Sequence, residues 1–385
     1  MSVVEGRLLL DGAFVPGRLV VADGRIARVE RLEGEDAPRL ANGPFVAPGL
    51  IDLHVHGYGG GSAATDLGRM ATSLARAGTT GFVATTFPLA PTALGALCER
   101  LDREGRSLEA GARMLGLHVE GPFVNPRKAG ALNVDDLAAP SVAALRALLG
   151  PATGDGRGIR IATVAPELPG ADALIEELVR SGVRVSLGHS LATAAEARNA
   201  ARAGATGATH LFNAMSGVHH RDAGLATFAL SDDAVVSEII GDLVHVGADA
   251  FSLALRARGP RGLALVSDAL EGAGTGCDVF ESHGHRVVLD EGAFWIEDLD
   301  ADGRPLPRTL TGAATSQLEA VRRLHARGVC SLEDALVMAS ETPARALGLQ
   351  ESLGRLHVGC WADCIILDAA DLSLTDVRIA GASAR

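Results

Sequence analysis

The chain changes character at Pro48-Gly49-Leu50-Ile51-Asp52-Leu53-His54-Val55-His56-Gly57. This stretch has the pattern of a short apolar strand that ends in two histidines. Residues two apart in a strand point to the same face, so His54 and His56 are expected to project together. Two imidazoles on one face at the end of a strand are suited to bind a divalent metal ion. A lone His-x-His pair is also compatible with a purely structural role, so the rest of the chain must decide between the two interpretations.

Beyond this stretch, short apolar segments alternate with helix-like segments. Eight segments have the continuous apolar character of buried parallel strands, at residues 50–56, 79–86, 113–120, 159–165, 183–189, 206–211, 235–240 and 263–268. Helical patterns lie between them at residues 66–77, 92–104, 138–149, 171–181, 192–203 and 247–257. Eight strands alternating with helices predict an α/β fold, a (β/α)8 TIM-like barrel, over residues 48–349.

Both ends of the chain have β character. In the first segment, Asp11-Gly12 and Asp23-Gly24 separate apolar runs and favour hairpin turns, because glycine accepts positive φ. The last segment returns to short apolar runs after Gly354. We therefore expect residues 1–47 and 350–385 to form one small, discontinuous β-sandwich domain.

A segment after the eighth predicted strand interrupts the alternation. Residues 271–309 begin with a Gly-rich stretch and continue with two apolar runs around Asp290-Glu291-Gly292, which is typical of a hairpin. We interpret this segment as an insertion near the mouth of the barrel. A helix is expected to follow at about 313–327, and another to start at Ser331, because Asp334 lies three residues on as in a capping box.

Composition excludes several classes of function. The 385 residues are 47% hydrophobic, enough for a sizeable core, and the net charge is -12 without any basic run, so nucleic acid is not an expected partner. An anionic ligand would need a local cationic pocket. The cysteines are scattered and odd in number, which predicts a cytoplasmic protein without a disulfide framework. No signal-peptide pattern and no apolar run of membrane-spanning length is found in the sequence, so no membrane partner is expected.

Side chains that can bind metal follow five of the eight predicted strands. In a barrel of this type, polar residues at the carboxyl ends of the strands converge on one site. One such histidine would more often be structural, but five strands that end this way predict a metal centre. The residues concerned are His54, His56, His118, Glu120, His189, His210 and Asp268.

Imidazoles and carboxylates in an open site favour Zn²⁺, or Fe²⁺, over Mg²⁺. Many two-metal barrels use a carbamylated lysine as a bridge, but Lys128, the only lysine, lies in a Pro/Gly-rich loop. Glu120 is therefore the expected shared ligand. Asp268 is the candidate general base, with a purely metal-ligating role as the alternative. His118, two residues before Glu120 on the same strand face, is expected to lie one layer deeper, where it orients a ligand.

These segments resemble the amidohydrolase superfamily of metal-dependent hydrolases and, within it, the N-acetylglucosamine-6-phosphate deacetylases. They occur in family order, and the Glu-Gly-Pro and Thr-His-Leu-Phe-Asn-Ala-Met signatures are the most specific. The terminal β segments are also similar to the family's split β-sandwich. The resemblance rests on Pro48-Gly49-Leu50-Ile51-Asp52, His118-Val119-Glu120-Gly121-Pro122, Gly188-His189-Ser190, Ala208-Thr209-His210-Leu211-Phe212-Asn213-Ala214-Met215 and Ser267-Asp268-Ala269.

The resemblance implies a role for each matching residue of the metal site. Glu120, His189 and His210 match the ligands of the family's common metal ion. His54 and His56 match positions that hold a second ion in some members, so one or two ions per subunit are expected. Asp268 matches the catalytic aspartate.

The resemblance also implies which residues bind the substrate, a small amino-sugar phosphate. Asn213 and Ala214 match the phosphate-binding turn, and His245 matches a sugar-binding histidine. Arg221 matches an arginine that reaches the substrate phosphate of the neighbouring subunit, which implies a homodimer. A planar guanidinium binds phosphate through two parallel hydrogen bonds, which is the physical reason to expect an arginine there.

The expected activity is the metal-dependent deacetylation of N-acetylglucosamine 6-phosphate to glucosamine 6-phosphate and acetate, in amino-sugar metabolism. The chain departs from the family at Leu132, where a histidine is usual, at Leu243-Val244 and at Gly312-Ala313-Ala314. These changes leave open the same chemistry on N-acetylgalactosamine 6-phosphate or on another N-acyl or cyclic amide. A non-catalytic barrel scaffold is a more distant alternative.

Overall fold

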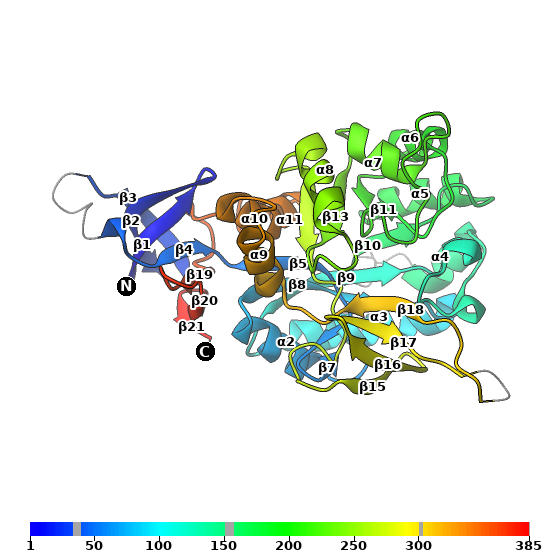
Figure 1. Ribbon diagram of the computed structural model, residues 1–385, viewed down its shortest axis with the longest axis horizontal. Coiled ribbons are helices and arrows are strands. Elements are labelled where there is room, and N and C mark those ends of the chain that lie inside the picture. The colour runs from blue at the N-terminus through cyan, green and yellow to red at the C-terminus, as the bar shows by residue number, and fades with distance from the viewer. Residues whose placement is uncertain (34–39, 151–157, 300–302, 385) are drawn as a thin grey trace.

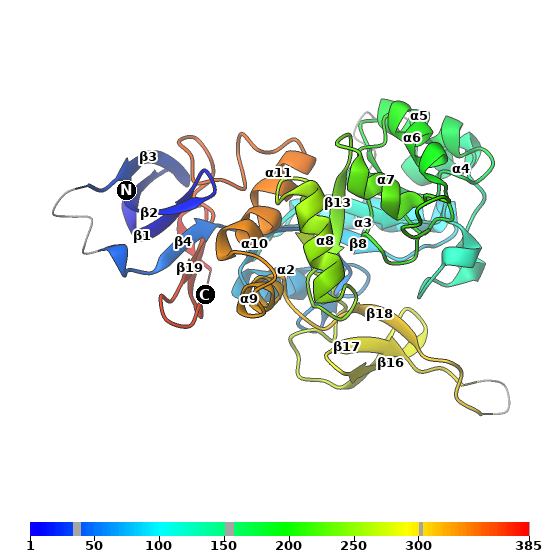
Figure 2. The ribbon, with the colours of Figure 1, turned by 45° about the horizontal axis from the view of Figure 1, so that its top comes forward.

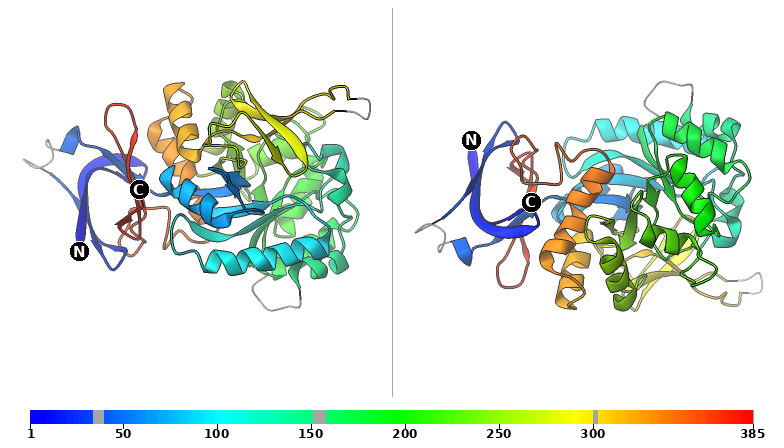
Figure 3. Two further views of the ribbon diagram at one scale, coloured as in Figure 1. Left: turned by 90° about the horizontal axis from the view of Figure 1, so that it is seen from below. Right: turned by 90° about the horizontal axis from the view of Figure 1, so that it is seen from above.

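A computed structural model describes residues 1–33, 40–150, 158–299 and 303–384. A β-sheet built from both termini lies at one end of the molecule and a helix-covered barrel at the other (Figure 1). Two opposite views show the same separation (Figure 3). Residues 300–302 of the predicted insertion and the last residue, Arg385, lie outside the described part of the chain.

The barrel consists of eight parallel strands, as predicted. Their order in the sheet, β5-β8-β9-β10-β11-β12-β13-β14, is the order of the chain, and each neighbouring pair is parallel. Every predicted strand is present. The bounds are β5 Leu50–Val55, β8 Thr79–Thr86, β9 Arg113–Glu120, β10 Ile159–Val164, β11 Arg184–Leu187, β12 Gly207–Ala208, β13 Val236–Ile240 and β14 Leu263–Val266.

Helices surround this sheet (Figures 1 and 2). They place apolar faces on the strands and begin at local capping residues, as α6 does with a capping box between Thr193 and Glu196. The bounds are α2 Leu67–Arg76, α3 Pro91–Arg106, α4 Val142–Leu149, α5 Ala171–Arg180, α6 Ala194–Arg202, α7 Leu225–Ser231, α8 Ala248–Arg258, α9 Gln317–Ala326, α10 Leu332–Ala339 and α11 Glu341–Ala346. No helix in the described part of the chain is long and apolar enough to cross a membrane.

Two predicted helices start later than expected, each for a capping reason. The helix expected over 138–149 begins at Val142, because the Ser141 side chain caps it by accepting a hydrogen bond from the Ala144 N–H. The helix expected over 313–327 begins after Ser316, which forms a capping box with Glu319. The helix predicted from Ser331 is present as α10, and Ser331 Oγ accepts from the Asp334 N–H.

The terminal sheet has seven strands in the order β21-β20-β19-β4-β1-β2-β3. The β4 strand joins the two ends of the chain, since it pairs parallel with β1 and antiparallel with β19. The separate β unit from both termini is therefore present, whereas its boundaries at residues 47 and 350 remain a prediction. The bounds are β1 Ser2–Leu10, β2 Ala13–Ala22, β3 Arg25–Arg31, β4 Phe45–Pro48, β19 Cys364–Leu367, β20 Leu374–Ile379 and β21 Ala382–Ser383.

The predicted insertion forms a four-stranded antiparallel sheet beside the barrel (Figure 2). The expected hairpin around Asp290-Glu291-Gly292 joins its second and third strands. The fourth strand ends beside the carboxyl ends of the barrel strands, through a bridge between Ala313 and Ala269. The bounds are β15 Val279–Ser282, β16 His285–Asp290, β17 Ala293–Ile296 and β18 Thr309–Ala313. A two-stranded ribbon, β6 Gly57–Tyr58 and β7 Gly61–Ser62, follows β5.

The first and last strands of the barrel are tied together by one side chain. The buried Gln317, at the start of α9, donates from Nε2 to the carbonyl oxygen of Ile51 in β5 and to that of Leu265 in β14, each at 2.8 Å. Main-chain bonds at the ends of these strands add to this closure, because the Asp268 N–H donates to the His54 carbonyl oxygen at 2.8 Å.

We expect Gln317→Ala to lower the free energy of unfolding by about 2 kcal/mol, because two buried carbonyl oxygens lose their donor. Urea denaturation followed by circular dichroism measures this change. His325→Ala, an exposed substitution in the same helix, should change stability by less than about 0.5 kcal/mol. Equal effects of the two substitutions would show that the tie contributes nothing.

Candidate metal and active site

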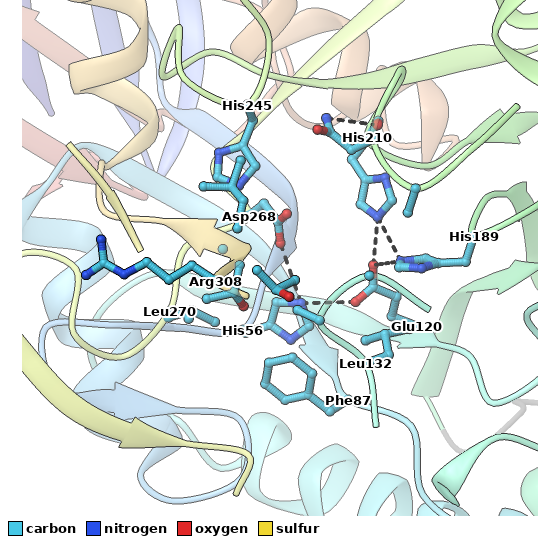
Figure 4. A pocket seen from close by; sticks show the side chains of 18 residues that line it. His56, Phe87, Glu120, Leu132, His189, His210, His245, Asp268, Leu270 and Arg308 are labelled. Atoms are coloured by element: carbon cyan, nitrogen blue, oxygen red, sulfur yellow. Dashed lines mark hydrogen bonds and ion pairs between the residues drawn. The ribbon is translucent and has the colours of Figure 1, made fainter. Parts of the chain in front are cut away.

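A cavity of about 420 Å³ opens at the carboxyl ends of the barrel strands (Figure 4). Glu120 ends β9, and the other predicted metal-site residues lie at or just after the ends of their strands, namely His54, His56, His189, His210 and Asp268. The wall next to them is formed by loops and by the last strand of the inserted sheet. The lining residues are His56, Phe87, Glu120, Gly130, Ala131, Leu132, His189, His210, Asn213, Ala214, His245, Asp268, Leu270, Arg308, Thr309, Leu310, Thr311 and Gly312.

The Glu120 carboxylate faces four imidazoles. Its Oε1 atom lies 3.1 Å from His189 Nε2 and 3.0 Å from His210 Nε2. On the other side, His54 Nε2 lies 3.4 Å from Oε1 and His56 Nε2 lies 3.3 Å from Oε2. All five side chains are buried. The residues that the sequence placed at three different strand ends, together with Glu120, therefore share one centre.

Asp268 lies beside His54 and His56. Its Oδ1 atom is 3.4 Å from His54 Nε2 and 3.5 Å from His56 Nε2. The carboxylate also faces the cavity. From this position Asp268 can act either as a proton acceptor or as a metal ligand. The backbone is strained here, since Asp268, His189 and His210 all have positive φ (52°, 47° and 28°). Such strain in non-glycine residues costs free energy and clusters at functional sites.

The donor set fits a cation. Three groups of histidine and acidic residues have ligand atoms close enough to hold one: Glu120 with His189 and His210, Glu120 with His54 and His56, and His54 with His118 and Glu238. In the first, the Nε2 atoms of His189 and His210 are only 3.0 Å apart, and in the second the two Nε2 atoms are 3.3 Å apart. Unprotonated ring nitrogens at this distance repel each other unless they share a positive charge.

Hydrogen bonds on the far side of two rings direct Nε2 toward the centre. His54 Nδ1 donates to Glu238 Oε2 at 3.0 Å, and His189 Nδ1 donates to the carbonyl oxygen of Lys128 at 2.8 Å. A proton on Nδ1 leaves the Nε2 lone pair free to bind metal. Lys128 thus contributes its main chain to the site and not its amino group.

Electrostatics in the centre favour positive charge. Burial alone would raise the pKa of Glu120, but His54 and the hydrogen bonds from His189 and His210 hold this pKa well below its ordinary value. Burial would lower the pKa of His54, but the charges of Asp268 and Glu120 raise it well above its ordinary value. The carboxylates therefore stabilise a cation at the imidazoles, whether a proton or a metal ion carries the charge.

His118 is fully buried and does not line the cavity, and its predicted role of orienting a metal ligand stays a prediction. Its ring packs edge-on against His54 with the centroids 4.5 Å apart, and Nε2 lies 2.8 Å from Thr163 Oγ1. Hydroxyl groups continue this contact across the barrel, from Thr163 to Thr209 and then to Ser186, each at 2.8 Å. Burial and the charge of His54 lower the pKa of His118 to about 3, so the ring is neutral at pH 7 and adds no positive charge beside His54.

The sequence analysis missed Glu238. This carboxylate is buried within β13, where it bonds His54. A glutamate in an otherwise apolar strand segment, Val235-Val236-Ser237-Glu238-Ile239-Ile240, is a signal that could have identified it, because buried charges require a partner.

Three of the four predicted substrate-binding residues line the cavity. They are Asn213, Ala214 and His245. His245 Nδ1 lies 2.7 Å from Asp242 Oδ2; burial would lower the pKa of His245, but this hydrogen bond and the charge of Asp242 raise it. Arg221 is exposed in a loop and does not line the cavity of its own chain. Its expected contact would therefore have to be made with another subunit.

Arg308 was not predicted. It lines the rim of the cavity, where its guanidinium points away from Glu120 (Figure 4) and pairs with Asp290 at 2.7 Å and Glu297 at 3.0 Å. Leu132, the departure from the family pattern, also lines the cavity and packs with Val124 and Ala129.

The model of the Amidohydrolase family matches residues 45–382. The chain belongs to the amidohydrolase family. Members of this family are metal-dependent hydrolases, so the chain is a hydrolytic enzyme that acts on an amide.

Relatives of this amidohydrolase share most of its length. The N-acetylglucosamine-6-phosphate deacetylase of Bacillus subtilis (strain 168) is 34% identical over 95% of this chain and 94% of its own. The N-acetylgalactosamine-6-phosphate deacetylase of Escherichia coli O157:H7 is 32% identical over 95% of each chain. A solved structure of a mutant N-acetyl-D-glucosamine-6-phosphate deacetylase from Mycobacterium smegmatis, in complex with N-acetyl-D-glucosamine-6-phosphate, has a TM-score of 0.86 and 30% identity and covers 99% of this chain and 98% of that one. The resemblance seen in the motifs is confirmed.

We expect Glu238→Gln to weaken divalent metal binding about 10- to 100-fold, because an amide orients the His54 ring less strongly than a carboxylate does. Titration of the metal-free protein with Zn²⁺ against a competing chelator measures the change. Glu176→Gln makes the same chemical change on the exposed face of α5 and should leave the affinity unaltered. An unchanged affinity in Glu238→Gln would contradict the orienting role.

Proposed function

We propose that this amidohydrolase removes the acetyl group of N-acetylglucosamine 6-phosphate, with glucosamine 6-phosphate and acetate as products. The observation that carries the proposal is the convergence of Glu120, His189 and His210 beside Asp268 at the end of a lined cavity. An amide of this kind is hydrolysed by adding water to the carbonyl carbon and a proton to the leaving nitrogen. The centre contains groups suited to both tasks.

Glu120, His189 and His210 would hold the metal ion. A divalent ion bound there supplies Lewis acidity, which lowers the pKa of water and polarises a carbonyl oxygen. Zn²⁺ suits these nitrogen and oxygen donors, with Fe²⁺ as the alternative. His54 and His56 supply donors for a second ion on the other side of Glu120, so the proposed stoichiometry is one or two ions per subunit.

Asp268 is the proposed general base and acid. Its carboxylate accepts the proton of the attacking water and then delivers that proton to the amine nitrogen as the C–N bond breaks. Asp268 can carry out both proton transfers without moving, because its carboxylate faces both the cavity and the metal-ligating histidines.

The sugar phosphate end of the substrate is assigned to Asn213, Ala214 and His245. These residues line the cavity, and the raised pKa of His245 favours the imidazolium, which attracts a phosphate or sugar oxygen. Arg221 is assigned to the phosphate in the neighbouring site of a homodimer, since its own cavity lies out of reach. We place the reaction in the cytoplasm, in amino-sugar metabolism.

A second substrate is supported by one observation. The Escherichia coli relative is named for N-acetylgalactosamine 6-phosphate, whose ring differs only at carbon 4. The apolar Leu132 in the cavity cannot hydrogen-bond to a substrate, so the polar contacts of this chain differ from the usual family pattern. Comparison of kcat/KM for the two phosphates decides between the substrates.

Acetate release from N-acetylglucosamine 6-phosphate tests the function and the proposed base together. We expect Asp268→Asn to retain the wild-type metal content but to lose on the order of 10³-fold in kcat, since the amide cannot accept a proton. Enzyme-coupled acetate detection and elemental analysis give the two values. Near-normal turnover in Asp268→Asn would contradict the assignment of Asp268 as the base. An inactive wild-type protein with full metal content would contradict the assignment of the substrate.

The role of Arg221 in the neighbouring site predicts complementation between two inactive variants. Arg221→Ala and Asp268→Asn subunits, co-expressed with different tags and purified as mixed dimers, should regain about half of the wild-type activity per dimer, because one of the two sites is then intact. Homodimers of either variant are the controls. Mixed dimers no more active than these controls, or a monomer in light scattering, would contradict the proposal.

A further inference from the structure

His56 differs from His54 and His189 in how it is held, and His210 shares this difference because its buried Nδ1 atom also has no hydrogen-bond partner among the described residues. His54 and His189 each donate from Nδ1 to an acceptor, but among the described residues His56 Nδ1 has no hydrogen-bond partner, although it is buried. A metal-ligating imidazole needs its ring plane fixed, because the lone pair of the ligating nitrogen lies in that plane. Some other contact must set the orientation of His56.

That contact is a stack of three rings. Phe87, directly after β8, lies parallel to His56 with 4.1 Å between centroids and 15° between planes. The other face of Phe87 is covered by His283, with 4.0 Å between centroids and 24° between planes. Figure 4 shows the Phe87 ring beside His56 at the edge of the cavity. Phe87 is therefore held between two imidazoles and has little freedom to rotate away.

The outer ring comes from the insertion. His283 lies at the tip of the β15–β16 hairpin and has φ +40°, the left-handed region. Its ring contacts His285 at 5.1 Å, and His285 Nδ1 bonds Asp298 Oδ2 at 2.6 Å. Burial and the charge of His56 lower the pKa of His283 to about 4, so its ring is neutral at pH 7 and stacks without the cost of a buried charge.

Leu132 completes the support of Phe87. The small apolar cluster of Val124, Ala129 and Leu132 packs against the Phe87 ring. This contact gives the departure at Leu132 a physical reason, since an apolar side chain suits the edge of an aromatic ring.

We propose that Phe87 and His283 are positioning residues for the metal ligand His56, so that the inserted sheet completes the metal site. The inference rests on the proposed metal centre but not on the identity of the substrate. It predicts that loss of the outer ring loosens metal binding on the His54–His56 side of Glu120. The side formed by His189 and His210 has no part in the stack and should be unaffected.

Titration of the metal-free full-length protein with Co²⁺, followed by visible absorption, tests the proposal. His283→Asn removes the ring but tolerates positive φ, so its effect is free of backbone strain. We expect this variant to bind one Co²⁺ equivalent about tenfold more weakly, with an altered spectrum. Phe87→Tyr keeps a flat ring in the middle of the stack and should stay within about twofold of wild type. Glu281→Gln, an exposed change in the same hairpin, should have no effect.

Phe87→Leu removes the middle ring and gives an independent measurement should His283→Asn disturb the hairpin, which far-UV circular dichroism would show. Wild-type affinity and spectrum in both ring-deleted variants would overturn the stacking role while leaving the metal centre intact. Equal losses in Phe87→Tyr and Phe87→Leu would overturn it as well. If the wild-type protein binds no Co²⁺, the metal centre itself fails together with this inference, whereas missing acetate release in a metal-binding protein overturns only the substrate.

Discussion

The constraint on which this structure depends is a buried carboxylate that faces four imidazoles. Removing Glu120 from water is costly unless its charge is compensated, and the compensation comes from rings on three other strand ends. The barrel fold brings the carboxyl ends of these strands together at one site. A cation shared between ring nitrogens about 3 Å apart removes the repulsion between their lone pairs, so the donors and the ion stabilise one another.

The rings that face Glu120 are held in different ways. A carboxylate fixes His54, a main-chain carbonyl fixes His189, and a ring stack covers His56. Hydrogen bonds and stacking restrict a ring differently: a hydrogen bond fixes which nitrogen carries the proton, whereas a stack fixes the plane. The supports come from parts of the chain far from one another in sequence, namely β13, the loop after β9 and the inserted sheet. Elements remote from the chemistry therefore contribute to its geometry.

Positive charge is concentrated locally at the cavity, although the protein as a whole is negatively charged. The net charge of -12 would repel an anionic substrate, and many arginines of the described chain are occupied by acidic partners, as Arg308 is by Asp290 and Glu297. Positive charge toward the cavity comes from the centre itself and from His245, whose pKa Asp242 raises. Because global repulsion is screened by salt over about 10 Å, local cationic groups decide which anion binds.

Periodicity and strand-end chemistry determined much of this protein from the sequence alone. Apolar segments predicted all eight barrel strands, and Glu120, His189 and Asp268 were recognisable because each lies where an apolar segment ends. These signals are local, since a strand needs only its own pattern and the barrel then places every strand end at one face. Phe87 and His283 carried no such signal. The polar signal of Glu238 does not identify its partner, because His54 lies 184 residues away and only the packed chain brings these groups together. Tertiary structure decided which rings are held, and by what, because the orientation of a side chain depends on contacts that no local pattern encodes.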